Sequence, residues 1–149
     1  MTKELDEKLC QKYPKIFKGR HGNMKETAMC WGISCSDGWY NIIDILCSNL
    51  QWNTDKNNDK GRYPQIVASQ VKEKFGGLCF YVESATPEQF AVINFVESMS
   101  YHVCEGCGSM DNIGRTIGWA TTLCSKCAPT SKYYQTWRLL EDINKEPLP

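Results

Sequence analysis

The chain has 149 residues, enough for one ordinary domain, or for one domain with a small metal-held element. Lysine plus arginine and aspartate plus glutamate are equal at 17 each, and this balance argues against a general nucleic-acid binder, which usually carries a basic excess. The N-terminal residues lack the apolar segment of an export signal and no apolar run approaches a membrane span, so we expect a reducing cytoplasm and no membrane partner.

The first 35 residues predict one helix and an irregular segment. The helix begins at a cap on Thr2, runs to about Tyr13 and is ended by Pro14. The stretch from Met29 to Cys35 is short and apolar, which indicates either a buried strand or a loop packed on the core.

A second helix is predicted after Ser36-Asp37-Gly38, which offers a helix start. Its apolar residues recur at i, i+3, i+4, i+7 and i+11, the stripe of a helix that faces a core. They are Trp39, Ile42, Ile43, Leu46 and Leu50. The polar stretch 53–61 that follows predicts an exposed loop.

From Ile66 to Val82 apolar and polar residues alternate, which predicts an antiparallel hairpin. Gly76-Gly77 is the expected two-residue turn. A third helix is predicted behind the cap Thr86, with Pro87 at the first helical position. Its expected core face leads directly into a cysteine motif and consists of Val92, Phe95, Val96, Met99 and Val103.

Two C-x-x-C pairs, Cys104/Cys107 and Cys124/Cys127, are separated by 16 residues and predict a four-thiolate zinc site. Each pair forms a turn that brings two sulfurs to one ion, and Gly108 suits the tight turn after the first pair. Four protein ligands leave no open position, so the zinc is expected to be structural. Disulfides and a redox-active C-x-x-C fit less well, and an iron–sulfur cluster can also take four cysteines.

Three further cysteines, Cys30, Cys35 and Cys47, lie within one stretch of the chain, with His21 upstream. They are candidates for a second metal site, although their spacing is unusual. Cys47 falls within an apolar helix, where cysteine commonly behaves as a small hydrophobic residue. We expect a small core residue there in preference to a ligand.

The segment from Pro129 to Ser131 predicts the start of a last helix carrying Tyr133, Trp137 and Leu140 on one side. A helix directly after the second cysteine pair favours a treble-clef-like element over a zinc ribbon. The fold class is therefore α+β, with helices packed on a small antiparallel hairpin. We expect a core domain at 1–103 and a zinc-binding element at 104–149, packed as one unit.

A basic and aromatic surface is the candidate binding site. Its members are Arg115, Trp119, Lys126, Tyr133 and Tyr134. Such rings and cations can contact nucleic acid or a protein, and the alternative is that they are ordinary surface charges and partly buried aromatics. The chain contains no phosphate-binding glycine loop, G-x-S-x-G or H-E-x-x-H motif. Candidate carboxylates at Asp37, Asp44, Glu83 and Glu97 all have ordinary capping or surface explanations, so no catalytic residue is assigned.

Three segments resemble a family of small, functionally uncharacterised proteins of tailed bacteriophages and prophages. They are Cys30-Trp31-Gly32 through Asp44, Gln70–Gly76, and Glu97–Ser100 leading into the cysteine pairs with Gly118-Trp119. The resemblance spans most of the chain, with the polar loop near 53–61 shorter here. It implies expression in a bacterial host cytoplasm and assigns no activity or catalytic residue.

Two functions are compatible with these observations. The first is a non-enzymatic phage accessory protein that binds a host protein and inhibits a bacterial defence system, such as a CRISPR effector. The second is a zinc-dependent nucleic-acid-binding protein of phage takeover or regulation that uses residues 104–138. Oligomeric state and target are left open by the sequence.

Overall fold

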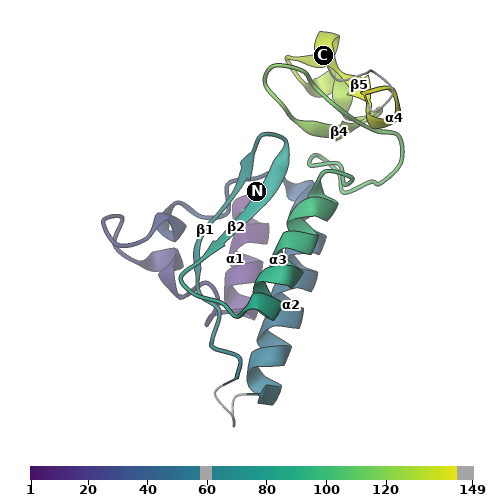
Figure 1. Ribbon diagram of the computed structural model, residues 1–149. Coiled ribbons are helices and arrows are strands. Elements are labelled where there is room, and N and C mark those ends of the chain that lie inside the picture. Colours follow the sequence, from purple (N-terminus) through teal and green to yellow (C-terminus); the bar gives the residue numbers. More distant parts are fainter. Residues whose placement is uncertain (58–61, 144–149) are drawn as a thin grey trace.

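The computed structural model describes residues 1–57 and 62–143. Figure 1 shows the longer helices beside a hairpin, with the C-terminal strands forming a separate element at one end. The helices are α1 (Lys3–Lys12), α2 (Tyr40–Asn57), α3 (Pro87–Ser100) and the short α4 (Leu140–Ile143). Strands β1 (Ala68–Lys74) and β2 (Gly77–Val82) form the hairpin, and β3 (Ile113–Arg115), β4 (Thr122–Cys124) and β5 (Arg138–Leu139) form an antiparallel sheet in the order β4-β3-β5. The predicted α+β class is confirmed.

Helix α2 is the centre of the main core. All five residues of its predicted apolar stripe are buried: Trp39, Ile42, Ile43, Leu46 and Leu50. The helix follows a single 3₁₀ turn, Asp37–Trp39, and continues to Asn57. The predicted exposed loop is therefore wrong over its first five residues, 53–57, which are helical, and residues 58–61 lie outside the described part of the chain.

The apolar stretch before α2 is a loop packed on the core. It contains a 3₁₀ turn, Ala28–Trp31, and then extended backbone with Ile33 and Cys35 buried. The backbone of Ser34 forms a short parallel bridge to β1, accepting from the Glu73 amide at 2.9 Å. Of the two sequence-based alternatives, the packed loop is the one observed.

The hairpin forms as predicted, with its turn shifted by one residue. Lys74 pairs with Gly77, so the two central turn residues are Phe75 and Gly76. Both have positive φ, 54° and 81°, as the tight turns of two-residue hairpins require. The sequence placed Gly76-Gly77 in the turn because glycine is the usual occupant. Gly77 is instead the first residue of β2, where the ring of Tyr101 leaves no room for a side chain.

Helix α3 begins with the predicted cap. The Thr86 side chain accepts from the Gln89 amide and the Gln89 side chain accepts from the Thr86 amide, a complete capping box. Val96 and Val103 are buried as predicted, but Phe95 is exposed, and Ile93 lies in the core instead. The buried side of α3 is rotated relative to the predicted apolar stripe, because it also includes the polar residues Gln89 and Ser100.

The predicted last helix is wrong. Residues after Cys127 form two 3₁₀ turns, Ala128–Thr130 and Tyr134–Thr136, and then strand β5, which pairs with β3. The three-stranded sheet therefore resembles a zinc ribbon, and the treble-clef alternative loses the helix on which it rested. Trp137, expected on that helix, packs on the sheet and donates its indole N–H to the Leu123 carbonyl at 3.1 Å.

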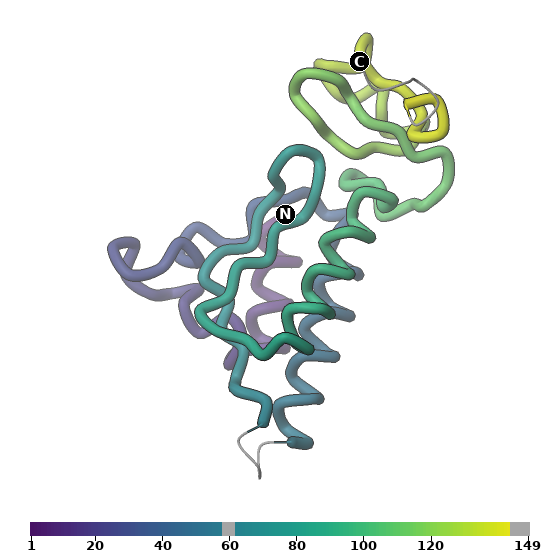
Figure 2. Tube along the Cα trace, viewed as in Figure 1, coloured from purple at the N-terminus to yellow at the C-terminus, as the bar shows by residue number. Residues whose placement is uncertain are grey.

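The buried apolar residues form two clusters, which meet in sequence between Val103 and Cys104. The larger cluster is made by the helices, the hairpin and the segments that pack on them, and it ends at Val103. The smaller cluster belongs to the C-terminal element and consists of Cys104, Ile113, Leu123, Cys124 and Ala128. Figure 2 shows the chain leaving α3 and entering the C-terminal element through one connecting loop. The proposed division at 103/104 stays a prediction, and residues 144–149 lie outside the described residues.

Candidate metal centre

The first cysteine pair begins four residues after α3 ends at Ser100. Cys104 follows Val103, whose carbonyl accepts from the Trp39 indole at 2.9 Å. The Cys104 amide donates to the Ser109 carbonyl and the Cys104 carbonyl accepts from the Gly108 amide, both at 2.8 Å. Gly108 has φ 78°, so the predicted use of glycine after this pair matches the turn observed.

The second pair is held by the β3–β4 hairpin, which lies between the two motifs. Cys124 is the last residue of β4 and pairs with Ile113. Asn112, at φ 48°, accepts from the Ser125 amide at 3.0 Å, and the Cys127 amide donates to the Cys124 carbonyl at 3.1 Å. The short hairpin therefore returns the chain so that its second turn faces the first.

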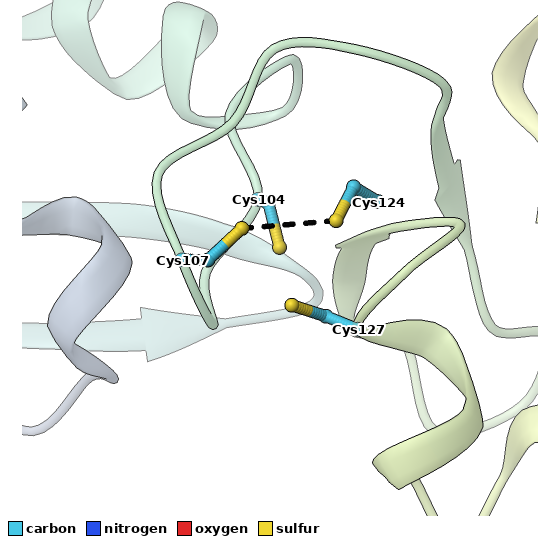
Figure 3. A group of neighbouring side chains, drawn as sticks. All are labelled: Cys104, Cys107, Cys124 and Cys127. Atoms are coloured by element: carbon cyan, nitrogen blue, oxygen red, sulfur yellow. Dashed lines mark hydrogen bonds between the residues drawn. The ribbon is translucent and has the colours of Figure 1, made fainter.

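The four sulfurs gather at one point (Figure 3). All lie within 4.8 Å of one another, and the Cys107 and Cys124 sulfurs are 3.7 Å apart. Thiolates at 2.3 Å from a tetrahedral ion are separated by about 3.8 Å, whereas a disulfide requires about 2.05 Å. All nine cysteines lie in the described part of the chain and are free thiols. The cluster can hold a metal ion, and a donor set of four sulfurs in this arrangement suits zinc or iron.

Hydrogen bonds within the cluster favour one thiolate. Burial raises the pKa of Cys104, although the amides of Cys124 and Cys107 donate to its sulfur. Burial also opposes ionisation of Cys124, but the Cys127 amide and the other three thiols outweigh it and lower the pKa of Cys124 to about 7. Burial and the neighbouring cysteines raise the pKa of Cys127. A cation bound by the four cysteines would supply the positive charge that favours ionisation of the remaining thiols.

Glu105, inside the first C-x-x-C turn, connects the cluster to the main core. Its side chain accepts from the Ser36 amide at 2.9 Å and its carbonyl accepts from the Gly38 amide at 2.8 Å. Its own amide donates to the Thr122 carbonyl of β4 at 2.9 Å. A side chain on Gly38 would collide with the carbonyl oxygens of Cys104 and Glu105, so glycine permits this close approach. Burial raises the pKa of the Glu105 carboxyl.

A second set of contacts joins the C-terminal sheet to the tip of the β1–β2 hairpin. The Thr122 hydroxyl donates to the Gly76 carbonyl at 2.6 Å. The Arg115 guanidinium lies over the Tyr101 ring at 4.6 Å, and its Nε is buried without a hydrogen-bond partner. Arg115, predicted as a surface cation, is therefore part of the seam between the two clusters.

The other predicted surface residues separate into two places. Trp119 stacks on Tyr133, with ring centroids 6.3 Å apart and an interplanar angle of 19°, and Tyr134, the next residue along the chain, is exposed. Lys126 is exposed in the second cysteine turn, at the opposite end of β4 from the Trp119 loop. The structure thus brings Trp119 and Tyr133 together, with Tyr134 next to them in sequence, and places Arg115 and Lys126 elsewhere.

Phe75 joins this surface, and the sequence prediction missed it. Its side chain is 74% exposed at the hairpin tip, and that of Trp119 is 65% exposed. The two rings line a pocket of 260 Å³ with Glu73, Lys74 and Ala120. We call Phe75, Trp119, Tyr133 and Tyr134 the aromatic patch. A large apolar residue beside a predicted glycine turn was the available signal for Phe75.

The second candidate metal site is not formed among the described residues, where the cysteine motif is the only cluster with metal-ligand geometry. Cys47 is fully buried in α2, and burial raises its pKa well above the ordinary value. Burial also raises the pKa of Cys35 to about 12. Both behave as small core residues, as expected for Cys47.

The four candidate carboxylates each have a structural partner. Asp37 accepts from the Thr2 amide at 2.6 Å, and Asp44 accepts from the Lys12 ammonium at 2.8 Å. Glu97 accepts from the Phe80 amide at 2.6 Å, and Glu83 lies 3.7 Å from the Lys18 ammonium. Each of the four carboxylates therefore has a structural contact within the fold.

No protein-family model matches the chain, and no curated protein or solved structure matches it either. The resemblance to phage proteins has no support from these comparisons and stays a hypothesis. None of the helices in the described residues combines the length and the apolar character needed to cross a membrane. The four-cysteine motif is the part of the resemblance that the structure supports.

Proposed function

We propose that the metal ion is zinc and that its role is structural. Four sulfurs converge on one position, and an ion bound by all four has no place for water or substrate. The two cysteine turns lie at the two ends of the segment that contains the β3–β4 hairpin and share the Glu105–Thr122 hydrogen bond, so an ion bound by all four sulfurs would join them further. Through Glu105 the same site positions the sheet against the main core.

We propose further that the chain is a non-enzymatic protein that binds another protein through the aromatic patch. The observation that carries this proposal is the pair of exposed rings, Phe75 and Trp119, on the tips of two hairpins at either side of one pocket. Exposed aromatics beside a pocket are the usual centres of binding energy in protein interfaces. The Thr122–Gly76 hydrogen bond holds the two tips in fixed register, which reduces the entropy lost on binding.

The resemblance to phage proteins suggests which partner this is. On that basis we propose a protein of the bacterial host, bound in the host cytoplasm, and inhibition of a defence system as the outcome. This finer part of the proposal rests on the resemblance alone. A small protein that presents rigid aromatic rings suits inhibition by blocking a surface.

Single-stranded nucleic acid is the second candidate, favoured by the Trp119–Tyr133 stack and two adjacent lysines. The Lys132 ammonium lies over the Tyr133 ring at 4.9 Å and that of Lys74 lies over Phe75 at 5.2 Å. Bases stack on such rings and phosphates pair with such cations. The candidate ranks second because Arg115 points into the seam and Lys126 lies at the far end of β4.

The test is capture of partners by the tagged, metal-loaded protein from infected bacteria, with and without nuclease. We expect Phe75→Ala and Trp119→Ala each to weaken capture at least about 30-fold, as loss of an interface anchor does. Met110→Ala, at an exposed apolar residue outside the patch, is the matched control and should leave capture unchanged. A protein that is retained after nuclease treatment and released by both patch variants supports the proposal.

Two results would contradict it. Capture that depends on nucleic acid and falls steeply with salt would favour the second candidate, because phosphate contacts release counterions. In that case Lys74→Ala with Lys132→Ala should weaken binding as strongly as Trp119→Ala. Capture that ignores both aromatic variants would move the binding surface elsewhere.

A further inference from the structure

A second exposed apolar surface lies on the paired helices α2 and α3, which Figure 1 shows side by side along one edge of the molecule. Ile45 and Trp52 on α2 and Phe95 on α3 are 65%, 59% and 66% exposed. Between the helices is a groove of 210 Å³ whose lining is almost wholly apolar, including Leu46, Val92 and Met99. We call Ile45, Asn49, Trp52 and Phe95, with this groove, the helical face.

The helical face is unusual because it carries no charge. Residues 45–54 of α2 and 89–96 of α3 contain no aspartate, glutamate, lysine or arginine. Two acids flank this stretch of α3: Glu97 turns inward to accept from the Phe80 amide, and Glu88 is exposed in the first turn of the helix but does not line the groove. On α2, Asp44 lies at the edge of the helical face, where it lines a neighbouring pocket with Ile45 and Trp52, but its charge is paired with Lys12 of α1 and with the Tyr13 hydroxyl. Exposed helix surfaces in monomeric proteins normally carry charged residues on the side turned to water.

The absence of charge on the helical face limits which partners can bind it. An acidic or basic partner finds no opposite charge here, and burying its charges unpaired would cost free energy. A second copy of the same helical face brings no unpaired charge to bury, because Asp44 at its edge is paired with Lys12. Its border residues are Ser48, Asn49, Asn53, Asn94 and Ser98. Amides and hydroxyls both donate and accept hydrogen bonds, so equivalent residues can pair across a twofold axis, where like charges would repel.

Each of the two helices also contributes one exposed apolar side chain to the groove, Ile45 from α2 and Phe95 from α3. A copy turned by 180° would bring its Phe95 ring to the groove of the first. The result is a four-helix arrangement of two α2–α3 pairs. We propose that the helical face is a homodimer interface and that the protein is a reversible dimer.

The size of the helical face sets the expected affinity. The 14 residues of α3 span about 21 Å, and two helix diameters span about 20 Å, which gives a footprint of roughly 400 Å² per copy. Stable interfaces bury about 800 Å² per partner, and smaller ones are weak. We therefore expect dissociation in the micromolar range.

Sedimentation velocity from low micromolar to submillimolar concentration tests the dimer. The wild type should move from the 17.0 kDa monomer towards twice that mass. Phe95→Glu and Ile45→Glu should each raise Kd at least about 30-fold, since each dimer then buries two unpaired charges. Asn49→Glu exchanges one exposed polar residue for another, cannot disturb the core, and should raise Kd in the same direction.

Phe75→Glu in the aromatic patch is the matched control and should leave the dimer intact. Circular dichroism and bound metal should equal those of the wild type for every variant. The proposal is overturned if the wild type remains monomeric over the whole range, or if Phe75→Glu dissociates the dimer while Phe95→Glu does not. Capture of a different protein that depends on Phe95, by a chain that stays monomeric, would assign the helical face to that partner instead. The aromatic-patch proposal is tested separately, because Trp119→Ala should lose its partner without changing the mass.

Discussion

Close backbone approach at Gly38 joins the two halves of the molecule. The Gly38 amide donates to the Glu105 carbonyl at 2.8 Å, and no side chain fits between residue 38 and the first cysteine turn. A methyl group here must push the two segments apart. This position shows how one residue in the main core controls the placement of the metal site.

We expect Gly38→Ala to lower the free energy of unfolding by about 2–3 kcal/mol, the usual cost of forcing an extra carbon into a packed contact. Urea unfolding monitored by circular dichroism measures the change. Gly106→Ala is the matched control in the same cysteine turn, because its added carbon would be 3.4 Å from the nearest atom, an ordinary contact. Equal losses for the two variants would contradict the proposed close approach.

The Asp44 carboxyl makes the free energy of unfolding depend on pH. Burial alone would raise its pKa, but hydrogen bonds from Lys12 and Tyr13 lower it below the ordinary 3.8. A carboxyl whose pKa is lower in the folded state contributes stability above the unfolded pKa and loses it as the pH falls through the folded pKa.

Asp44→Asn should therefore destabilise the protein at neutral pH by up to about 1 kcal/mol, a modest value because the Lys12 end is half exposed. The difference from the wild type should shrink below pH 3.8 and vanish once the wild-type carboxyl is protonated. Chemical unfolding at a series of pH values measures it. A difference that stays constant into strong acid would show that the charge of Asp44 is not responsible.

At the scale of elements, the β1–β2 turn carries both conformational strain and an exposed ring. Phe75 has φ 54°, a conformation that costs a bulky residue free energy, while 74% of its side chain remains exposed. Stability alone would favour asparagine, which forms this turn readily before glycine. An aromatic residue retained there is consistent with a binding role for the aromatic patch.

Phe75→Asn should raise the free energy of unfolding by about 0.5–1 kcal/mol by relieving this strain. The same variant should lose capture of the protein partner. Thermal unfolding and the capture assay, done on one preparation, check both outcomes. A variant that is less stable than the wild type would show that the Phe75 ring stabilises the turn by packing.

At the scale of the whole molecule, loss of the metal should destabilise the C-terminal sheet more than the helices of the main core. The main cluster of buried apolar residues is large and contains no member of the cysteine motif, whereas the second cluster consists of five residues, two of them candidate ligands. Small elements with so little apolar core usually require a metal or disulfides. The C-terminal sheet is therefore expected to depend on the ion more than the helices do.

Cys124→Ser should remove stoichiometric metal and raise amide hydrogen exchange across residues 104–139, while α1 and α2 keep their protection. Elemental analysis and hydrogen exchange by mass spectrometry measure these effects. Cys79→Ser, at a partly buried thiol outside the cluster, is the control and should retain the metal. Bound iron would appear as visible absorption and would replace zinc in the proposal, and a metal-free wild type with an ordered C-terminal sheet would contradict a structural metal.

The sequence by itself determined the local features of this protein. Periodicity predicted α2 and the hairpin, because one buried face imposes its period on the residues of a helix or a strand. The cap at Thr86 predicted the start of α3, and C-x-x-C spacing predicted which four sulfurs converge, since two adjacent turns of fixed length can reach one ion.

Only the tertiary structure decided what depends on contacts between distant residues. Phe95 lies on an apolar-looking stripe but is exposed, because Gln89 and Ser100 take its place on the buried side. Arg115 was expected on the surface and stacks on Tyr101 in the seam. The predicted last helix does not form at Arg138 and Leu139 because these residues pair with β3, and only the short α4 follows them. Composition near a residue sets its propensity, but which face is buried is settled by the segments that pack against it.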